Sequence, residues 1–447
     1  MNKFKQQALK NRVLDIQNLS KNSENNIKLI LFIIFLISLS IKAIVFILTK
    51  NILEGGAFPD RYQYIAYGEQ IAGGNWNPGL IDGPMWVAPG LPLIVAFMKL
   101  LFNDGTLPTV ILNMLLSSAS IFILYYLGKE LFDHKIGLIM AFWMAVYYPA
   151  IKFSIFVYKE ALLYFFVPLT LFLLIKSLKK EFDLKYIILS ALSYGILVHI
   201  DERYIFYLPV FPLIYFLNRR AELFGTRVKS YILWIVMVII LLIPWTVRNF
   251  YVFDQLVILS TRTTTFTSKI FGEDLYGGDN KHGVYYNLKT KTFQMADWDT
   301  FSLNEARKIA DQKDMNLQIF SKREARLRSF FHYWKPTFFK PHFICLGYRV
   351  EHWLLSANIT SILYYGIFLP FYFIGLYLLF KRRFFIPLFL SVIPILHSLI
   401  HAYLIMPLGR YRSPLDFIVA MIGLWAMFEI YYYVIHLREK RKYLKVG

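Results

Sequence analysis

Residues 27–48 read IKLILFIIFLISLSIKAIVFIL, a run in which nearly every position is apolar. About 20 such residues form a helix that spans the hydrocarbon core of a bilayer. Runs of similar length and character recur along the chain. They lie near residues 109–127, 136–153, 160–176, 186–200, 204–218, 230–247, 357–380, 384–404 and 416–437. The sequence therefore predicts an all-α, polytopic membrane protein with about ten transmembrane helices.

The composition supports a membrane protein over a nucleic-acid-binding protein. Only 17% of the 447 residues are charged and 57% are hydrophobic, whereas a soluble domain carries about 25% charged residues. The net charge of +20 comes from Lys and Arg in short segments between the apolar runs, as membrane topology requires. The single cysteine, Cys345, excludes an internal disulfide and a cysteine-rich metal site.

The short basic segments predict the sidedness of the chain. With ten spans, all of them fall on the same side of the membrane as the N-terminus, and the positive-inside rule makes that side cytoplasmic. These segments are 1–26, 176–180, 218–229, 381–383 and 437–442. We therefore expect a multi-pass protein of the plasma membrane with both termini in the cytoplasm and a retained N-terminal anchor.

The same topology divides the chain into regions. We expect cytoplasmic tails at 1–26 and 438–447, an N-terminal transmembrane region at 27–247 with a first outer loop at 49–108, and a C-terminal transmembrane region at 356–437. One long extracytoplasmic loop domain covers 248–355. The run 86–102, WVAPGLPLIVAFMKLLF, opens with prolines and glycine and contains Lys99. We expect it to form a re-entrant or juxtamembrane helix, because counting it as a span would put the N-terminal tail opposite the other basic segments.

Residues 58–70, FPDRYQYIAYGEQ, follow the first span, and their tyrosines have helical spacing. They predict a surface helix that begins at Asp60. Four other segments bring ionisable residues to the same outer face. These segments are Lys159 and Glu160, then Asp201 to Arg203, Arg248 in PWTVRN, and Arg410 with Arg412 in GRYRSP.

An ionisable group at membrane depth marks a functional site by default, but each of these residues also has a structural interpretation. Arg248 alone is typical of a snorkelling anchor, and Glu160 of a charge that complements a helix N-terminus. Asp201 and Glu202 fit a solvated turn. The three outer histidines, His199, His397 and His401, are expected to be packed or hydrogen-bonded side chains rather than metal ligands.

Carboxylates and arginines on one membrane face suit a defined chemistry. A carboxylate can take the proton from an acceptor hydroxyl as a general base. Guanidinium groups can bind a phosphate and stabilise it as it leaves. The pattern indicates a substrate that carries a phosphate at the membrane surface and a group to be transferred.

Three motifs resemble one family when taken together. FPDRYQYIAYGEQIAGGNW (58–76), PWTVRN (244–249) and GRYRSPLD (409–416) are similar to motifs of the GT-C superfamily of polyprenyl-phosphate-sugar glycosyltransferases. The nearest group contains relatives of the dolichyl-phosphate-mannose–protein mannosyltransferases (glycosyltransferase family 39) and of the lipid A aminoarabinose transferase. The motifs occur in the family's order and on the family's outer face.

The resemblance implies roles for particular residues. Asp60 stands at the position of the catalytic base, and Glu160 matches a second acidic position. Arg248, Arg410 and Arg412 fall where the family places cations near the donor phosphate, and we group Arg203 with them. Arg61 stands where many relatives carry a second acid, and we assign it to the phosphate as well.

The resemblance also implies a reaction and its partners. The donor is a sugar on undecaprenyl or dolichyl phosphate, the acceptor is a protein, lipid or glycan, and transfer at the extracytoplasmic face inverts the anomeric carbon. A divalent metal stays open, since some members use one. Two alternatives remain, a transporter or flippase of lipid-linked glycans and a non-catalytic partner in glycan assembly. The absence of internal repeats disfavours the transporter, whereas Arg61 at the second-acid position keeps the non-catalytic alternative open.

Overall fold

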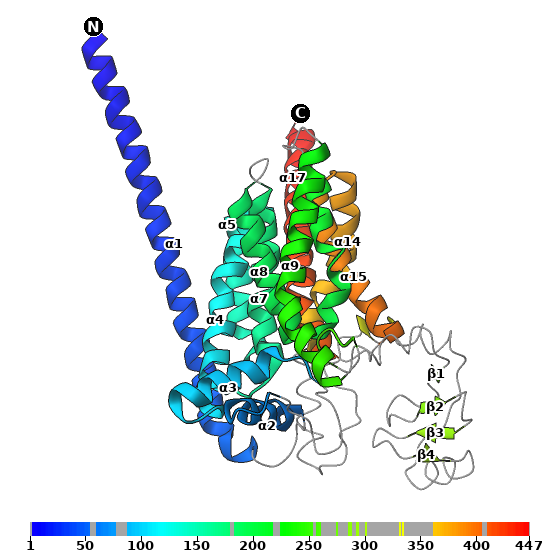
Figure 1. The fold of residues 1–447 in the computed structure, drawn as a ribbon. Coiled ribbons are helices and arrows are strands. Elements are labelled where there is room, and N and C mark those ends of the chain that lie inside the picture. The colour runs from blue at the N-terminus through cyan, green and yellow to red at the C-terminus, as the bar shows by residue number, and fades with distance from the viewer. Residues whose placement is uncertain are drawn as a thin grey trace.

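The computed structural model describes residues 2–53, 60–76, 87–178, 183–217, 224–253, 256–260, 361–404 and 409–446, and short pieces of 261–360. Long helices form a bundle, and α2 and α3 lie at the end opposite the two chain termini (Figure 1). The helices are α1 (Asn2–Leu53), α2 (Asp60–Ala72), α3 (Gly90–Phe102), α4 (Thr106–Leu131), α5 (His134–Val146), α6 (Tyr148–Ser154), α7 (Lys159–Ser177), α8 (Leu184–Ile200), α9 (Phe224–Phe253), α14 (Phe368–Lys381), α15 (Phe385–Leu404), α16 (Gly409–Arg412) and α17 (Asp416–Val446).

Within the described residues, six helices are long and apolar enough to cross a membrane, and α5 with α6 makes up to seven. The α5–α6 pair is bent by 47° at Tyr147. The chain is thus a multi-pass helical membrane protein, and the count of ten spans stays a prediction. Helices α8 and α15 are shorter apolar helices at two of the predicted spans. Both chain termini lie at one end of the bundle (Figure 1), and which side of the membrane that end faces is also still a prediction.

The prediction of an α-helical span at 204–218 is wrong. This segment is wound as two 3₁₀ helices, η1 (Glu202–Tyr207) and η2 (Phe211–Leu217). Pro209 and Pro212 each lack an amide donor and clash with the preceding turn of an α-helix, which explains the departure. A 3₁₀ helix rises about 2 Å per residue, so a short segment of this kind covers more length than an α-helix would.

A small antiparallel sheet is the feature that the all-α prediction did not include. Its strand order is β1-β2-β3-β4, and Tyr286 pairs with Phe293 across the β2–β3 register. The strands are β1 (Asp274–Leu275), β2 (Tyr285–Asn287), β3 (Thr292–Gln294) and β4 (Thr300–Phe301). Most of the predicted loop domain 248–355 lies outside the described residues.

Two shorter helical turns shape the C-terminal part. A π-helical turn, η4 (Ile362–Gly366), leads into α14, and η5 (Ser413–Leu415) joins α16 to α17. Helix α14 packs against α17, as α4 packs against α5 and α7 nearer the N-terminus. The GRYRSP motif (409–414) thus lies in α16 and η5, directly before the last long helix of the bundle.

A buried lysine joins the first span to α4. Lys42 is fully buried, and its ammonium donates hydrogen bonds of 2.9 Å to the hydroxyls of Ser38 and Ser118. Polar groups in an apolar interior require such partners. Lys42 therefore serves helix–helix packing between α1 and α4.

Helix α2 begins at Asp60, as predicted, and its tyrosines form its packing face. Tyr64, Tyr67 and Ile71 are buried, whereas Tyr62 is 47% exposed. This spacing is that of one helix face, and the face lies against α3. Helix α3 has 13 residues and is about 20 Å long at 1.5 Å per residue, too short to cross the hydrocarbon core. This length agrees with the expectation that 86–102 does not span the membrane.

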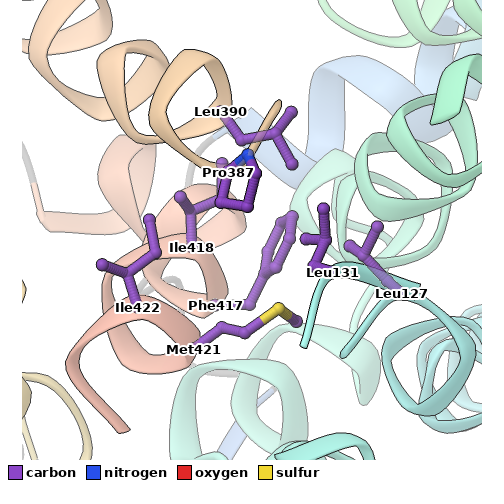
Figure 2. A pocket seen from close by; sticks show the side chains of 8 residues that line it. All are labelled: Leu127, Leu131, Pro387, Leu390, Phe417, Ile418, Met421 and Ile422. Carbon is purple, nitrogen blue, oxygen red and sulfur yellow. The ribbon is translucent and has the colours of Figure 1, made fainter. Parts of the chain in front are cut away.

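A small apolar hollow lies between α4, α15 and α17 (Figure 2). Every side chain that lines it is apolar. The lining residues are Leu127, Leu131, Pro387, Leu390, Phe417, Ile418, Met421 and Ile422. The hollow offers no polar group for a phosphate or a sugar, so the candidate site lies elsewhere.

The close approach of α2 and α3 yields a prediction. A Cβ atom at Gly68 would lie 2.5 Å from the Cβ and Cγ1 atoms of Val95 and 2.9 Å from the Pro92 carbonyl oxygen. We expect Gly68→Ala to destabilise the protein by about 1–3 kcal/mol, the usual cost of overpacking. Thermal unfolding in detergent measures the effect.

Gly73→Ala is the matched control. A Cβ atom there would meet only the Gln70 and Glu69 carbonyl oxygens, both at 3.5 Å, so unfolding should be unchanged. Equal melting temperatures for the two variants would contradict this packing.

Candidate active site

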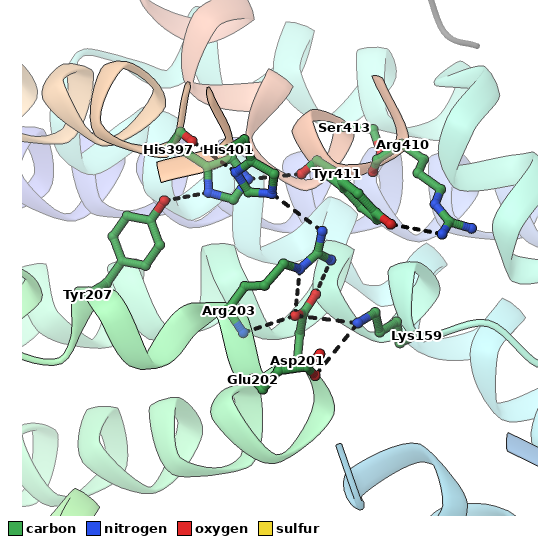
Figure 3. A network of polar contacts seen from close by, with 10 residues as sticks. All are labelled: Lys159, Asp201, Glu202, Arg203, Tyr207, His397, His401, Arg410, Tyr411 and Ser413. Carbon is green, nitrogen blue, oxygen red and sulfur yellow. Dashed lines mark hydrogen bonds and ion pairs between the residues drawn. The ribbon is translucent and has the colours of Figure 1, made fainter. Parts of the chain in front are cut away.

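A network of charged and aromatic side chains joins four segments that are distant in sequence (Figure 3). They are the first turn of α7, the α8–η1 junction, the C-terminal part of α15, and α16 with η5. Helices α2 and α3 contact the surroundings of this network. Tyr64 of α2 lies 6.3 Å from Tyr158 between ring centroids, and Gly90 of α3 lies against the backbone of His199 and Ile200. The predicted outer segments therefore meet at one end of the bundle.

Asp201 is the centre of the charged cluster. It is 0% exposed and accepts hydrogen bonds from the Arg203 guanidinium, with Nε at 2.7 Å. The Lys159 ammonium lies 3.4 Å from Asp201 Oδ1 and 3.9 Å from Glu202 Oε2. Burial alone would raise the pKa of the Asp201 carboxyl, but the charges of Arg203 and Lys159 hold that pKa below its ordinary value. Since Asp201 and Glu202 are fully buried, the alternative of a solvated turn is wrong.

Glu160 is the second residue of α7 and is 1% exposed. Neither of its carboxylate oxygens is hydrogen-bonded to another described residue. Three cations lie near enough to act on its charge, namely Arg410, Lys159 and Arg203. A buried carboxylate with open acceptor positions can take a hydrogen bond or a proton from a bound molecule.

Arg203 and Arg410 both contact the ring of Tyr411. The Arg203 Cζ atom lies 3.9 Å from the ring centroid and the Arg410 Cζ atom 4.9 Å. Arg410 Nη2 also donates a hydrogen bond of 2.9 Å to the Tyr411 hydroxyl. Cation–π contacts of this kind hold guanidinium groups in place. The structure thus brings together two predicted cations and the predicted acid Glu160.

Arg412 has a different environment from Arg410. Its Nε donates to Asp416 Oδ1 at 2.9 Å, its Nη1 donates to the Tyr333 carbonyl at 2.9 Å, and its Cζ lies 3.7 Å from the Tyr365 ring centroid. Asp416 in turn accepts a hydrogen bond of 2.7 Å from the Tyr147 hydroxyl. Arg412 is buried, and these contacts fix the start of α17 against the α5–α6 bend.

The remaining predicted cations lie on or beside α2. Arg61 donates to the Tyr62 hydroxyl at 2.7 Å, and its Cζ is 5.9 Å from the Phe156 ring, close before α7. Arg248 Nε donates to the Trp76 carbonyl at 2.9 Å, which ties α9 to the segment after α2. Asp60 is the first residue of α2, and its side chain lies outside the described part of the structure.

Several residues of the network were not assigned to the site from the sequence. His397 and His401 contact Tyr207, Arg203 and the Tyr411 carbonyl. The spacing of Arg412 and Asp416 is that of an ion pair along a helix and would have indicated their pairing. No comparable local signal links the histidines to Arg203, which is 198 residues from His401.

The divalent metal stays an open prediction, and we looked for its ligands among the described residues. Among them, no group of three or more His, Cys, Asp and Glu side chains converges as a metal site would require. The Asp201 carboxylate is already bound by Arg203 and Lys159. We therefore derive no catalytic step through a metal.

Residues 84–247 match the family model of the dolichyl-phosphate-mannose–protein mannosyltransferases. Over this range, the predicted resemblance to that family is confirmed. The matched range contains Glu160 and Arg203 and ends one residue before Arg248. No curated protein sequence gives a significant match.

Solved structures of the Archaeoglobus fulgidus oligosaccharyltransferase show a distant likeness. The apo form matches with a TM-score of 0.42 at 14% identity over 92% of this chain and 51% of that chain. A complex with zinc and sulfate gives 0.41 at 12% identity over 90% and 50%. A complex with an inhibitory peptide and a dolichol-phosphate gives 0.38 at 12% identity over 92% and 51%. The chain spans about half the length of these structures.

The contrast between Arg412 and Arg410 yields a prediction. Arg412→Ala leaves Asp416 as an uncompensated buried charge, which costs about 3–5 kcal/mol. Arg410 is only half-buried, so Arg410→Ala should leave unfolding nearly unchanged. Denaturant unfolding of the two purified variants measures both effects.

The double variant Arg412→Ala/Asp416→Ala provides the control. This variant removes both charges. Its loss of unfolding free energy should therefore be smaller than the sum of the losses in the two single variants. Additive losses, or an Arg412→Ala protein as stable as the wild type, would contradict a bracing role for this ion pair.

Proposed function

We propose that the chain is an integral-membrane glycosyltransferase of the GT-C type. It transfers a sugar from a polyprenyl phosphate, undecaprenyl or dolichyl, to a hydroxyl group of a protein, lipid or glycan acceptor. The observation that carries this proposal is a buried carboxylate, Glu160, within electrostatic reach of Arg203 and Arg410, which both contact Tyr411 at the end of the bundle where α2 begins. The family-model match over 84–247 supports the donor class.

The reaction is a single displacement at the anomeric carbon. The acceptor oxygen forms a bond to that carbon as its proton passes to a carboxylate, and the bond from carbon to the phosphate oxygen breaks. The electron pair leaves with the polyprenyl phosphate, so its negative charge increases as the reaction proceeds. Cations placed beside that phosphate stabilise the transition state more than the ground state.

The two arginines at Tyr411 divide this task. The Arg203 guanidinium is held by Asp201, so it contributes a fixed positive charge. Arg410 also contacts the Tyr411 ring but is only half-buried. We therefore assign to Arg410 the hydrogen bonds to the donor phosphate. Arg412 and Arg248 serve the fold through the contacts described above, and the structure offers no support for placing Arg412 at the phosphate.

Asp60 is the proposed general base. It is the first residue of α2, whose Tyr64 packs beside Tyr158, immediately before Lys159 and Glu160. Arg61 comes directly after the base, and its guanidinium lies near the Phe156 ring. Glu160 is the second acid, placed to accept a hydrogen bond from the acceptor or the sugar.

Sugars on polyprenyl phosphates are used where nucleotide sugars are absent. On this ground we place the site at the extracytoplasmic face of the membrane.

Asp60→Asn tests the base directly. The amide keeps the size of the side chain and loses its basicity, so the turnover number should fall by about 10²–10⁴. The KM for the donor should stay within a few-fold of the wild type, because the phosphate contacts are unchanged. Transfer from a polyprenyl-phosphate sugar in proteoliposomes is the measurement.

Glu69→Gln is the matched control, since Glu69 is an exposed acid on the same helix. It should turn over as the wild type does. Normal turnover by Asp60→Asn would remove Asp60 from catalysis and make Glu160 the base.

A further inference from the structure

His397 and His401 lie one helical turn apart on α15 and have no part in the chemistry described above. Both side chains are buried, and their ring centroids are 4.0 Å apart. They lie beside the contact of Arg203 with Tyr411 (Figure 3). Their hydrogen-bond partners constrain which ring nitrogens carry a proton.

His397 contacts the backbone of the GRYRSP motif. Its Nε2 lies 3.1 Å from the Tyr411 carbonyl oxygen, and a carbonyl oxygen only accepts. Nε2 therefore carries the proton and donates it. Nδ1 is in hydrogen-bond contact with the Tyr207 hydroxyl. Because burial disfavours a charged ring, we expect Nδ1 to be the acceptor in this contact and the ring to be neutral.

His401 has the opposite tautomer. Its Nδ1 lies 2.8 Å from the His397 carbonyl oxygen and must donate to it. Nε2 is then an acceptor for Arg203 Nη1 at 3.4 Å. A proton on this Nε2 would face the Arg203 guanidinium, so the geometry requires a neutral His401 as well.

The two rings thus restrain Tyr411 and Arg203 from the side opposite Asp201. His397 holds the Tyr411 backbone, and His401 supplies Arg203 with a hydrogen-bond acceptor in addition to Asp201. The Tyr333 ring covers both histidines, at 5.7 and 5.6 Å between centroids. The histidines, Tyr411 and Arg203 form one packed unit next to Arg410.

We infer that His397 and His401 are positioning residues that orient Arg203 and Tyr411, and through Tyr411 also Arg410, to bind the phosphate group of a lipid-linked donor. This inference rests on the proposed function. Arginine and tyrosine side chains lose conformational freedom when they engage a ligand, and orienting them beforehand strengthens binding. Neither histidine contacts the donor itself.

The test uses the full-length protein in detergent with undecaprenyl phosphate as the probe. His401→Leu and His397→Leu remove the hydrogen bonds and should raise the Kd for the probe and the KM for the sugar donor about tenfold, the worth of about one such bond. Gln at either position should restore both constants to within about threefold, since its amide can accept from Arg203 or donate to the Tyr411 carbonyl. His199→Leu is the matched control, because among the described residues the His199 ring is hydrogen-bonded to Gly195 of its own helix, and it should change neither constant.

Wild-type Kd and KM in the leucine variants would overturn the inference. A leucine variant that yields less folded protein but binds the probe with the wild-type Kd would also overturn it, since that is the result of a purely structural role. A Gln variant that rescues nothing would overturn it as well.

A second readout separates this inference from the proposed function. Failure of the wild type to bind undecaprenyl phosphate would reject the proposed function, and ¹⁵N NMR of labelled histidines would then decide the positioning claim. At neutral pH we expect His397 to be protonated on Nε2 alone and His401 on Nδ1 alone. A charged ring or the reverse tautomers would overturn the inference.

Discussion

The buried ion pair between Asp201 and Arg203 is the interaction on which the end of the bundle depends. A charge removed from water costs several kcal/mol unless partners compensate it. Asp201 meets this requirement with Arg203 and with Lys159, which comes from another helix. The contact from Lys159 therefore fixes the first turn of α7 against the α8–η1 junction. Arg203, once fixed, provides the surface on which Tyr411 packs.

The charges at this end of the bundle have two kinds of role. Arg412 is used internally, because Asp416, Tyr333 and Tyr365 surround its guanidinium. Glu160 is buried without a hydrogen bond from another described residue, an arrangement that is costly in an apolar interior. Groups kept at such a cost are typical of sites that act on a bound molecule. Our proposal therefore places the chemistry at Glu160, Arg410 and the start of α2, with the Arg412 cluster as its support.

The sequence predicted what depends on local patterns and missed what depends on distant partners. Apolar runs located the long helices, and the tyrosine spacing located α2 and its start at Asp60. The 3₁₀ winding of 202–217 escaped prediction because hydropathy does not register the effect of Pro209 and Pro212 on the backbone. Arg410 and Arg412 looked equivalent in sequence, and only their three-dimensional partners separate them. The histidines of α15 became informative when their contacts with Arg203 and Tyr411 were known.

The central claim is that the donor phosphate binds at Arg410, in the charged network at the end of the bundle that carries α2. A structure of the full-length protein with undecaprenyl phosphate bound tests it most directly. The account predicts a phosphate oxygen within hydrogen-bond distance, about 3 Å, of the Arg410 guanidinium, with Arg203 still paired to Asp201. A phosphate bound at the opposite end of the bundle, or one that displaces Asp416 from Arg412, would contradict it.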